Sequence, residues 1–196
     1  MPLPLFTIGA NMASDSQICS VALNMLGQLP ISSLSQNAPR AEKCNAIYET
    51  IRDIELASHN WKFATVYVEL VIVDETPAFD FDYSFQLPQD FLKLVRTDSN
   101  SIKYRIVGDK LYTDDDEMYI EYIARITNPG DFSSPFTELL IARLAKDLAW
   151  GVTNNKALSI DLAENYKDVR RKATGIDSQA GTPRKLYRNA MNEARS

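Results

Sequence analysis

The sequence predicts an α+β protein: an antiparallel helical bundle of two N-terminal and two C-terminal helices, an inserted antiparallel β-sheet region and a basic C-terminal tail. Apolar residues recur at helical spacing toward both ends of the 196-residue chain and alternate with polar residues in its middle. Beyond Gly175 there are few large apolar side chains. These patterns divide the chain into a helical hairpin, a β region, a second pair of helices and an extended basic tail, over residues 1–60, 61–133, 134–175 and 176–196.

The first predicted helix runs from about Asp15 to Leu26. Ser14 and Gln17 form a capping-box pattern, which satisfies free backbone donors in the first turn. Gly27 suits the left-handed position after the helix, and Pro30 prevents its continuation. The inward face is predicted to carry Ile18, Val21, Ala22, Met25 and Leu26.

The second predicted helix begins near Pro39, which is favourable in a first turn, and extends to about His59. A short loop over residues 28–38 separates it from the first helix, so the two are predicted to form an antiparallel hairpin. Its inward face is predicted to carry Cys44, Ile47, Tyr48, Ile51 and Ile54.

The β region is predicted to begin with a strand over Trp61–Val73, where β-branched residues are frequent and apolar residues alternate with polar ones. An acidic loop follows, and Phe91–Arg96 is the second predicted strand. One side of the first strand is predicted to carry Val66, Val68, Leu70 and Ile72.

The remainder of the β region predicts an antiparallel meander. A Gly108-Asp109 turn separates its first two strands, and an acidic turn at Asp114–Asp116 precedes the third. The three predicted strands are Ile102–Val107, Lys110–Thr113 and Met118–Ile126.

The third predicted helix begins at Pro135, with Ser134 as the predicted cap. From Phe136 to Val152 charged residues are few, which is typical of a helix buried on several sides. Asn154-Asn155 is predicted to end it. A last helix follows over about Leu158–Thr174, with Leu158, Leu162, Tyr166 and Val169 on its inward face.

Composition limits the classes of function. Hydrophobic residues make up 45% of the chain, enough for a core, and the net charge of −5 gives no overall attraction to nucleic acid. Cys19 and Cys44 lie on apolar helix faces, so we expect buried thiols in a reducing compartment, with a disulfide as the alternative. Met1–Met12 lacks the features of a signal peptide, and no apolar run has membrane-spanning length, so a cytoplasmic product without membrane contact is expected.

The sequence offers little for catalysis, and we expect no enzyme activity and no cofactor. The single histidine, His59, is expected to interact with free carbonyls and the dipole at a helix end. No nucleophile elbow, Walker loop or dinucleotide fingerprint is present. Asp80 begins a calcium-loop pattern that fails, because Phe85 and Phe91 stand where glycine and glutamate are required. Asp114–Asp116 is expected to be a solvated turn, with a Mg²⁺ or Ca²⁺ site as the alternative.

An ordered set of short motifs resembles the tail tubular protein A family, the head-to-tail adaptors of short-tailed phages. The family's leucine-glycine-x-x-proline-x-serine-x-leucine loop matches residues 26–34, and its tryptophan-x-phenylalanine pair matches Trp61 and Phe63. A leucine-proline-x-aspartate entry to a strand matches residues 87–90. The resemblance covers about residues 14–175. The residues that carry it most directly are Gly27, Pro30, Trp61, Phe63, Leu87, Pro88 and Asp90.

The resemblance implies a structural virion protein at the head-tail interface, assembled in the host cytoplasm. It implies a homo-oligomeric, dodecameric ring between the portal protein and the tail nozzle (tail tubular protein B), with tail fibres as a further contact. DNA would pass through the channel without specific binding. Some adaptors dock a C-terminal segment into portal grooves. The corresponding candidates here are Arg184, Lys185, Leu186, Tyr187, Arg188, Met191 and Arg195.

Three alternatives remain at this point. The first is a head-completion protein of a long-tailed phage. The second is a phage hydrolase that acts through Asp80–Asp90 or Asp114–Glu117. The third is a nucleic-acid-binding module that uses basic residues near the C-terminus, namely Arg170, Arg171, Lys172, Arg184, Lys185 and Arg188.

Overall fold

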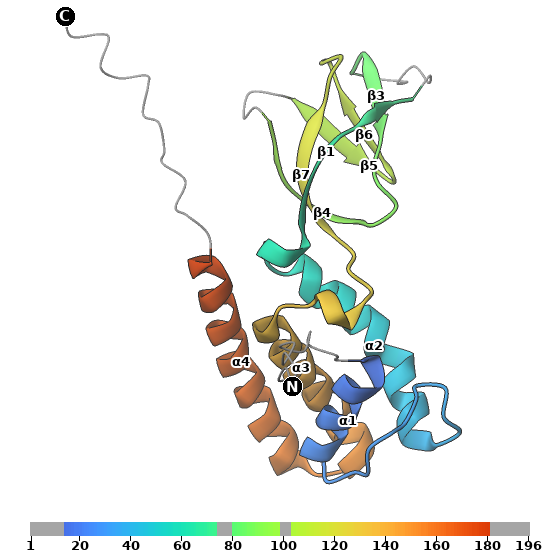
Figure 1. Ribbon diagram of the computed structural model, residues 1–196, viewed down its shortest axis with the longest axis vertical. Coiled ribbons are helices and arrows are strands. Elements are labelled where there is room, and N and C mark those ends of the chain that lie inside the picture. The colour runs from blue at the N-terminus through green and yellow to red at the C-terminus, as the bar shows by residue number, and fades with distance from the viewer. Residues whose placement is uncertain (1–13, 74–79, 99–102, 181–196) are drawn as a thin grey trace, which may run out of the picture.

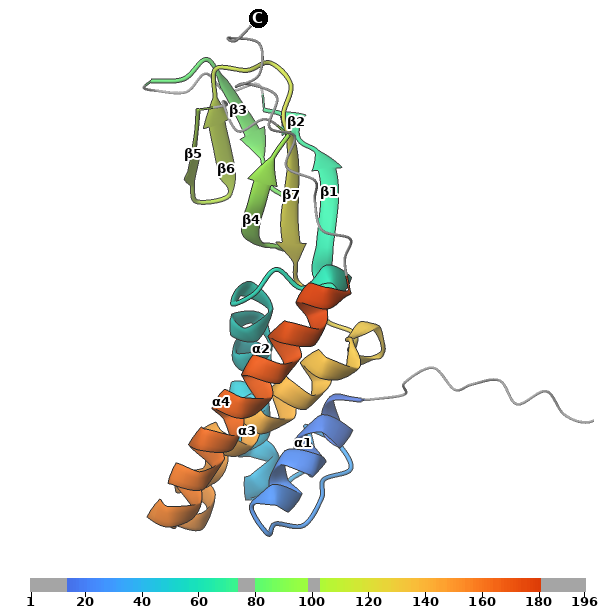
Figure 2. The same ribbon diagram turned by 90° about the vertical axis from the view of Figure 1, so that its left-hand side faces the viewer.

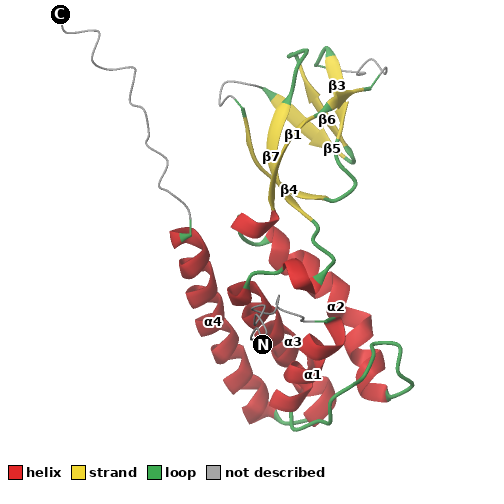
Figure 3. Cartoon of the chain, viewed as in Figure 1, coloured by secondary structure: helices red, strands yellow, loops and turns green. Residues whose placement is uncertain are grey.

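The fold was analysed in a computed structural model that describes residues 14–73, 80–98 and 103–180. The described chain is mixed α/β, with four α-helices and two antiparallel sheets. The helices gather at one end of an elongated molecule and the strands at the other (Figures 1 and 3). The predicted α+β class and the insertion of strands between two pairs of helices are confirmed.

Helix α1 spans Asp15–Met25, and both of its predicted end signals are present. Ser14 and Gln17 form the complete capping box. Gly27 has a φ of 70°, and its N–H donates to the Asn24 carbonyl while the Gln28 N–H donates to that of Leu23. These two bonds form a Schellman motif, which ends the helix where the sequence predicted.

Helix α2 spans Pro39–Ala57, and its inward face differs from the prediction by one position at its end. Ile54 is 47% exposed, whereas the neighbouring Glu55 is fully buried. A similar shift occurs on α1, where Val21 and Met25 are exposed and Leu23 is buried instead. In both helices the packing against α3 determines which side chains are buried. The buried face therefore differs from the face that carries the most apolar residues.

Helix α3 spans Ser134–Thr153 and is capped by Ser133 and not by the predicted Ser134. It packs against α1, α2 and α4, so the main hydrophobic core surrounds it. The side chains of Phe136, Leu139, Leu140 and Leu144 are fully buried. The predicted burial of this helix on several sides is confirmed.

Helix α4 spans Lys156–Gln179 and is longer than predicted. The break before it is confirmed, because Asn154 adopts a left-handed φ of 53° and the Asn155 side chain caps α4. Gly175 lies within the helix instead of after it. Leu162, Tyr166 and Val169 are buried as predicted, while Leu158 is only half-buried.

The strands form two sheets instead of the predicted meander. Sheet A has the order β1-β7-β4, and sheet B has the order β2-β3-β6-β5, with every neighbouring pair antiparallel. Their bounds are β1 Thr65–Glu69, β2 Val71–Ile72, β3 Tyr83–Gln86, β4 Phe91–Thr97, β5 Tyr104–Val107, β6 Lys110–Thr113 and β7 Tyr119–Ala124.

The first predicted strand is divided among three elements. Lys62–Ala64 is a 3-10 turn, η1, and the chain then passes from β1 in sheet A to β2 in sheet B at Leu70. Leu70 donates its N–H to the Met118 carbonyl and is buried, whereas Val66 and Ile72 are exposed. The predicted single apolar side of this segment is therefore wrong.

The two sheets enclose a second hydrophobic core, which includes Phe85, Leu111, Met118 and Ile120. Strand β3, within the predicted acidic loop, was not predicted, and it supplies Phe85 to this core. The β5–β6 hairpin was predicted, and Gly108 in its turn has the left-handed φ of 63° that such turns require. A second 3-10 turn, η2 at Pro129–Asp131, leads from β7 to α3.

Cys19 and Cys44 are fully buried free thiols on α1 and α2, as predicted. Contact with Cys44, followed by burial, raises the pKa of Cys19, so this side chain stays a thiol. Among residues 14–73, 80–98 and 103–180, no helix is long and apolar enough to cross a membrane. The predicted absence of a signal peptide concerns residues 1–12, outside the described residues.

Candidate functional site

The residues predicted to dock the portal all lie outside the described residues, because the structure describes the chain only to Ala180. They are Arg184, Lys185, Leu186, Tyr187, Arg188, Met191 and Arg195. The described chain shows where this segment begins, at the end of α4. The contacts that hold α4 in place therefore determine the position from which this segment leaves.

The family-like motif residues do not form one site. Gly27 and Pro30 lie in the loop between α1 and α2, and the Pro30 carbonyl is 3.4 Å from the Arg40 guanidinium. Trp61 and Phe63 lie between the helices and the sheets. The last three motif residues, Leu87, Pro88 and Asp90, lie in the turn that enters β4. Each group has a structural role in its own place.

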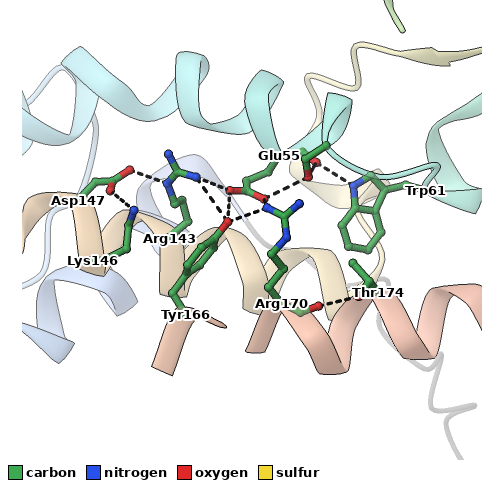
Figure 4. Close-up of polar contacts among 9 residues, drawn as sticks. Glu55, Trp61, Arg143, Lys146, Asp147, Tyr166, Arg170 and Thr174 are labelled. Atoms are coloured by element: carbon green, nitrogen blue, oxygen red, sulfur yellow. Dashed lines mark hydrogen bonds and ion pairs between the residues drawn. The ribbon is translucent and has the colours of Figure 1, made fainter. Parts of the chain in front are cut away.

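Glu55 is the centre of a polar network that joins α2, α3 and α4 (Figure 4). Its side chain is fully buried. The Arg143 guanidinium of α3 lies 2.8 Å from Glu55 Oε1, and the Tyr166 hydroxyl of α4 donates to the same oxygen at 2.8 Å. Arg170 of α4 lies 3.5 Å from Glu55 Oε2 and donates to the Tyr166 hydroxyl at 2.9 Å.

Two further contacts complete this network. The Arg143 Nε donates to Asp147 at 2.6 Å, and Ser58 Oγ donates to the Glu55 carbonyl at 2.9 Å. Burial alone would lower the pKa of Arg143, but hydrogen bonds to Asp147 and Tyr166 raise it overall. The guanidinium therefore stays charged beside the buried carboxylate. The network therefore holds α4 against α2 and α3.

The C-terminal end of α4 is held by a second buried carboxylate. Asp177 is 6% exposed, and its two oxygens lie 3.1 Å from His59 Nε2 and 3.1 Å from the Lys62 backbone N–H. The prediction that His59 binds free carbonyls at the end of α2 is therefore wrong, because its partner is a side chain on α4. This contact explains why α4 continues beyond Gly175.

An aromatic cluster connects the helices to the sheets next to this contact. Trp61 is fully buried, and its ring centroid lies 4.8 Å from that of His59 and 5.2 Å from that of Phe136. The Trp61 indole N–H donates to the Glu55 carbonyl at 2.9 Å. Phe63 and Phe132 pack against Phe136 at centroid distances of 5.2 and 5.0 Å. The connection between the helices and the sheets is thus packed by aromatic side chains.

Two polar contacts also cross from the helical part to the sheets. Arg125, after β7, donates from Nε to Asp53 of α2 at 2.8 Å. Lys93 of β4 donates to the Asn60 side chain at 2.9 Å. Together with the aromatic cluster, they hold the sheets in a defined position on the helices.

In the leucine-proline-x-aspartate motif, Asp90 accepts a hydrogen bond from the Tyr122 hydroxyl at 3.0 Å. Its carbonyl also accepts from the Arg125 N–H at 2.7 Å. Burial, followed by the hydrogen bond to Asp90, raises the pKa of Tyr122 to about 12. Asp90 therefore joins the start of β4 to β7.

The raised pKa of Tyr122 predicts a pH dependence of stability. An unfolded tyrosine loses its proton near pH 10, whereas the folded chain keeps it to about pH 12. The folded state binds more protons in that window, so the free energy of unfolding is expected to fall as the pH rises through it. Urea unfolding in this range should show a smaller decrease for Tyr122→Phe than for the wild type. The same slope in both would contradict the assignment, and Tyr104→Phe, at an exposed ring, is the matched control.

Two of the three basic residues predicted on α4 for nucleic-acid binding form ion pairs. Arg170 is engaged with Tyr166 and Glu55, and Arg171 lies 2.7 Å from Asp168. Only Lys172, of the three residues predicted for nucleic-acid binding on this helix, has no ion pair within the described chain. The structure therefore gives the nucleic-acid alternative little support on α4.

The acidic segments form no metal centre within the described residues. No group of three His, Cys, Asp or Glu side chains there could hold a metal ion. Asp115 closes a turn in which its N–H donates to Thr113 Oγ1 at 3.3 Å. Asp114, Asp116 and Glu117 are exposed to solvent.

Two grooves lie on the sheets. A groove of about 320 Å³ lies on sheet A between Tyr67, Arg96 and Tyr119. Arg96 is paired there with Glu121, and its guanidinium lies 5.4 Å from the centre of the Tyr67 ring. A second groove, of about 420 Å³, lies beside β2 in sheet B. These surfaces are the described candidates for contact with a partner.

Sequence reasoning missed Glu55 and Asp177, although a signal for one of them was present. Glu55 follows Cys44, Tyr48 and Ile51 at helical spacing, so an acid occupies a position on the buried face of α2. An acid at such a position indicates a buried ion pair. For Asp177 the spacing to Val169 and Ala173 gives a weaker signal, because the helix was predicted to end before it.

Comparison with known proteins adds no family. No model of a protein family matches the chain, and no curated protein matches its sequence. Functional inference therefore depends on the surfaces described above and on the resemblance of the sequence motifs.

Proposed function

We propose that the protein is a structural virion protein, a head-to-tail adaptor that forms a ring between the portal and the tail nozzle. In this proposal the four helices form an antiparallel bundle that builds the ring body. The sheets contact neighbouring subunits or the nozzle, and DNA passes through the channel without specific binding. The protein acts by geometry, with no substrate and no cofactor, and is assembled in the host cytoplasm into the virion.

The observation that carries this proposal is the exposure of large apolar side chains on both parts of the molecule. On the helices Trp150 is 58% exposed and Ile160 is 51% exposed. On the sheets Tyr67 is 66% exposed and Val71 is 73% exposed. Apolar side chains gathered at strand edges are a hazard for a monomer and are usually covered by a partner. A subunit with neighbours and partners at both ends fits this distribution.

The proposal assigns portal docking to the tail that follows α4. Residues 181–196 carry four basic side chains and one glutamate, a net charge of +3, so the rest of the chain carries −8. A basic segment with the apolar anchors Leu186, Tyr187 and Met191 suits a grooved, acidic partner. The network on Glu55 and the contact of Asp177 would hold α4 at the angle from which this tail leaves.

Electron microscopy of the purified protein with the portal protein of its own virus tests the proposal. We expect rings stacked on the portal, and reversal of the tail charges by Arg184→Glu, Lys185→Glu and Arg188→Glu should weaken this complex. Lys156→Glu, at an exposed residue near the start of α4, is the matched control and should leave it unchanged. A strictly monomeric protein with no affinity for portal would overturn the proposal.

A further inference from the structure

The directions of the two edge strands of sheet B would allow them to pair between two copies of the chain. The sheet has the order β2-β3-β6-β5, and each neighbouring pair is antiparallel. With four strands, β2 and β5 therefore run in opposite directions. If β2 of a second copy lay beside β5, the added pair would also be antiparallel. Alternate residues of an edge strand direct backbone N–H and C=O groups away from the sheet, ready for such pairing.

Both edges also expose apolar side chains. On β2, Val71 is 73% exposed and Ile72 is 48% exposed. On β5, Tyr104 is 45% exposed and Val107 is 56% exposed. Beside β2 the groove of about 420 Å³ has the buried side chain of Phe85 among its lining residues. This groove could receive apolar side chains from an approaching strand.

The charges of the two edges are opposite. Lys103 and Arg105 at β5 are exposed, and neither makes an ion pair with another described residue. The groove beside β2 is lined by Glu69, Asp116 and Glu117, and all three are exposed. Charged residues at a sheet edge often prevent association, because identical edges repel each other. Here two basic β5 edges would repel each other, as would two acidic β2 edges, whereas a β5 edge and a β2 edge would attract each other.

We propose that β5 of one copy of this chain docks on β2 and its acidic groove in the next copy, so that sheet B continues between subunits. The strands β2 and β5 are the two edges of sheet B, and in Figure 2 they lie on either side of β3 and β6. A contact between two different surfaces of the same chain is heterologous, and repetition closes into a ring if the rotation allows. The inference rests on the proposed ring and names the surfaces that form it.

A second copy fits these edges better than a different protein, because one chain carries both complementary halves. A self-paired dimer through either edge would place Lys103 and Arg105, or Asp116 and Glu117, against their own copies. Like charges across an interface are costly, whereas opposite charges favour association and fix its register. The charge pattern thus selects the head-to-tail arrangement over the symmetric dimer.

Charge reversal on the full chain tests the arrangement by sedimentation velocity. We expect Lys103→Glu/Arg105→Glu to weaken self-association by about tenfold or more, and Asp116→Lys/Glu117→Lys to do the same, since both create like-charge contacts. An equimolar mixture of the two variants should recover assembly, and so should the chain that carries all four substitutions. Glu49→Lys/Asp161→Lys, at exposed helical positions, is the control. If both variants lost self-association and their mixture did not recover it, the proposal would be overturned.

Disulfide trapping gives a second readout that does not depend on charge. Chains with one cysteine at Val71 or Ile72 and one at Tyr104 or Val107 should form a ladder of cross-linked multimers under mild oxidation. The native Cys19 and Cys44 are fully buried and can remain. A chain with only Val107→Cys should form no ladder, and a pair at Ile54 and Val107 is the control. Absence of a ladder from all four pairs, or dimers from Val107→Cys alone, would overturn the proposal.

The outcomes separate this inference from the proposed function. Rings on the portal that are insensitive to both charge reversals would leave the adaptor role standing and remove the sheet B contact. Head-to-tail multimers that respond to charge reversal but do not bind portal would support the contact and remove the adaptor role.

Discussion

Replacement of Glu55 by alanine is expected to lower the free energy of unfolding by about 3–5 kcal/mol, the range for removal of one partner from a buried ion pair. The carboxylate is fully buried, and it receives Arg143 and Tyr166 at 2.8 Å. Without it, the buried Tyr166 hydroxyl loses its acceptor, and the charged Arg143 guanidinium keeps Asp147 as its remaining acidic partner. Urea unfolding followed by circular dichroism measures the loss.

Two other substitutions on α2 test whether the loss comes from the buried charge of Glu55. Glu55→Gln keeps the shape and an acceptor for Tyr166 but removes the charge, so we expect a smaller loss, on the order of 1–3 kcal/mol. Glu49→Ala, at an exposed position of the same helix, should change stability by less than about 0.5 kcal/mol. Equal effects of Glu55→Ala and Glu49→Ala would show that the network contributes nothing to stability.

The helices could be predicted where local interactions determine them. The capping box of Ser14 and the left-handed Gly27 depend on residues within one turn, and both are present. The end of α4 could not be predicted in this way. Gly175 disfavours helix by about 1 kcal/mol relative to alanine, but Asp177 is bound to His59, which lies 118 residues away. A contact so distant in sequence leaves no local pattern.

The sheets were harder to predict because their pairing is not local. Alternation indicated strands correctly around Phe91 and Lys110. It could not show that the chain changes sheets at Leu70, which depends on a hydrogen bond to Met118. It also missed β3, because acids surround this strand in the sequence while its own Phe85 is buried against other strands.

The candidate site was predictable only in part. The basic tail is visible from composition, and its docking role stays a prediction because these residues lie beyond Ala180. Glu55 could have been recognised as a buried acid, but not its partners, since Arg143 and Tyr166 come from two other helices. The complementary edges of sheet B follow from strand order, which alternation alone does not provide. The tertiary arrangement therefore determines most of the candidate surface.

Trp61 is expected to be the most sensitive apolar residue, because the helical part and the sheets meet around it. Its side chain is fully buried, packs on Phe136 and His59, and donates to the Glu55 carbonyl. Trp61→Ala would leave a large cavity and remove the indole hydrogen bond to the Glu55 carbonyl. We expect a loss of about 3–5 kcal/mol in the free energy of unfolding, measured by urea unfolding with circular dichroism.

Trp150 provides a matched control, because it is the second of the two tryptophans in the chain and is 58% exposed on α3. Trp150→Ala leaves no cavity, so the change should stay within about 0.5 kcal/mol, as for most surface substitutions. The contrast separates the loss of packing from the loss of a tryptophan as such. A loss for Trp61→Ala no larger than for Trp150→Ala would contradict the assignment of the aromatic cluster as the rigid connection. In that case the sheets would be held on α2 mainly by the polar contact of Asp53 with Arg125.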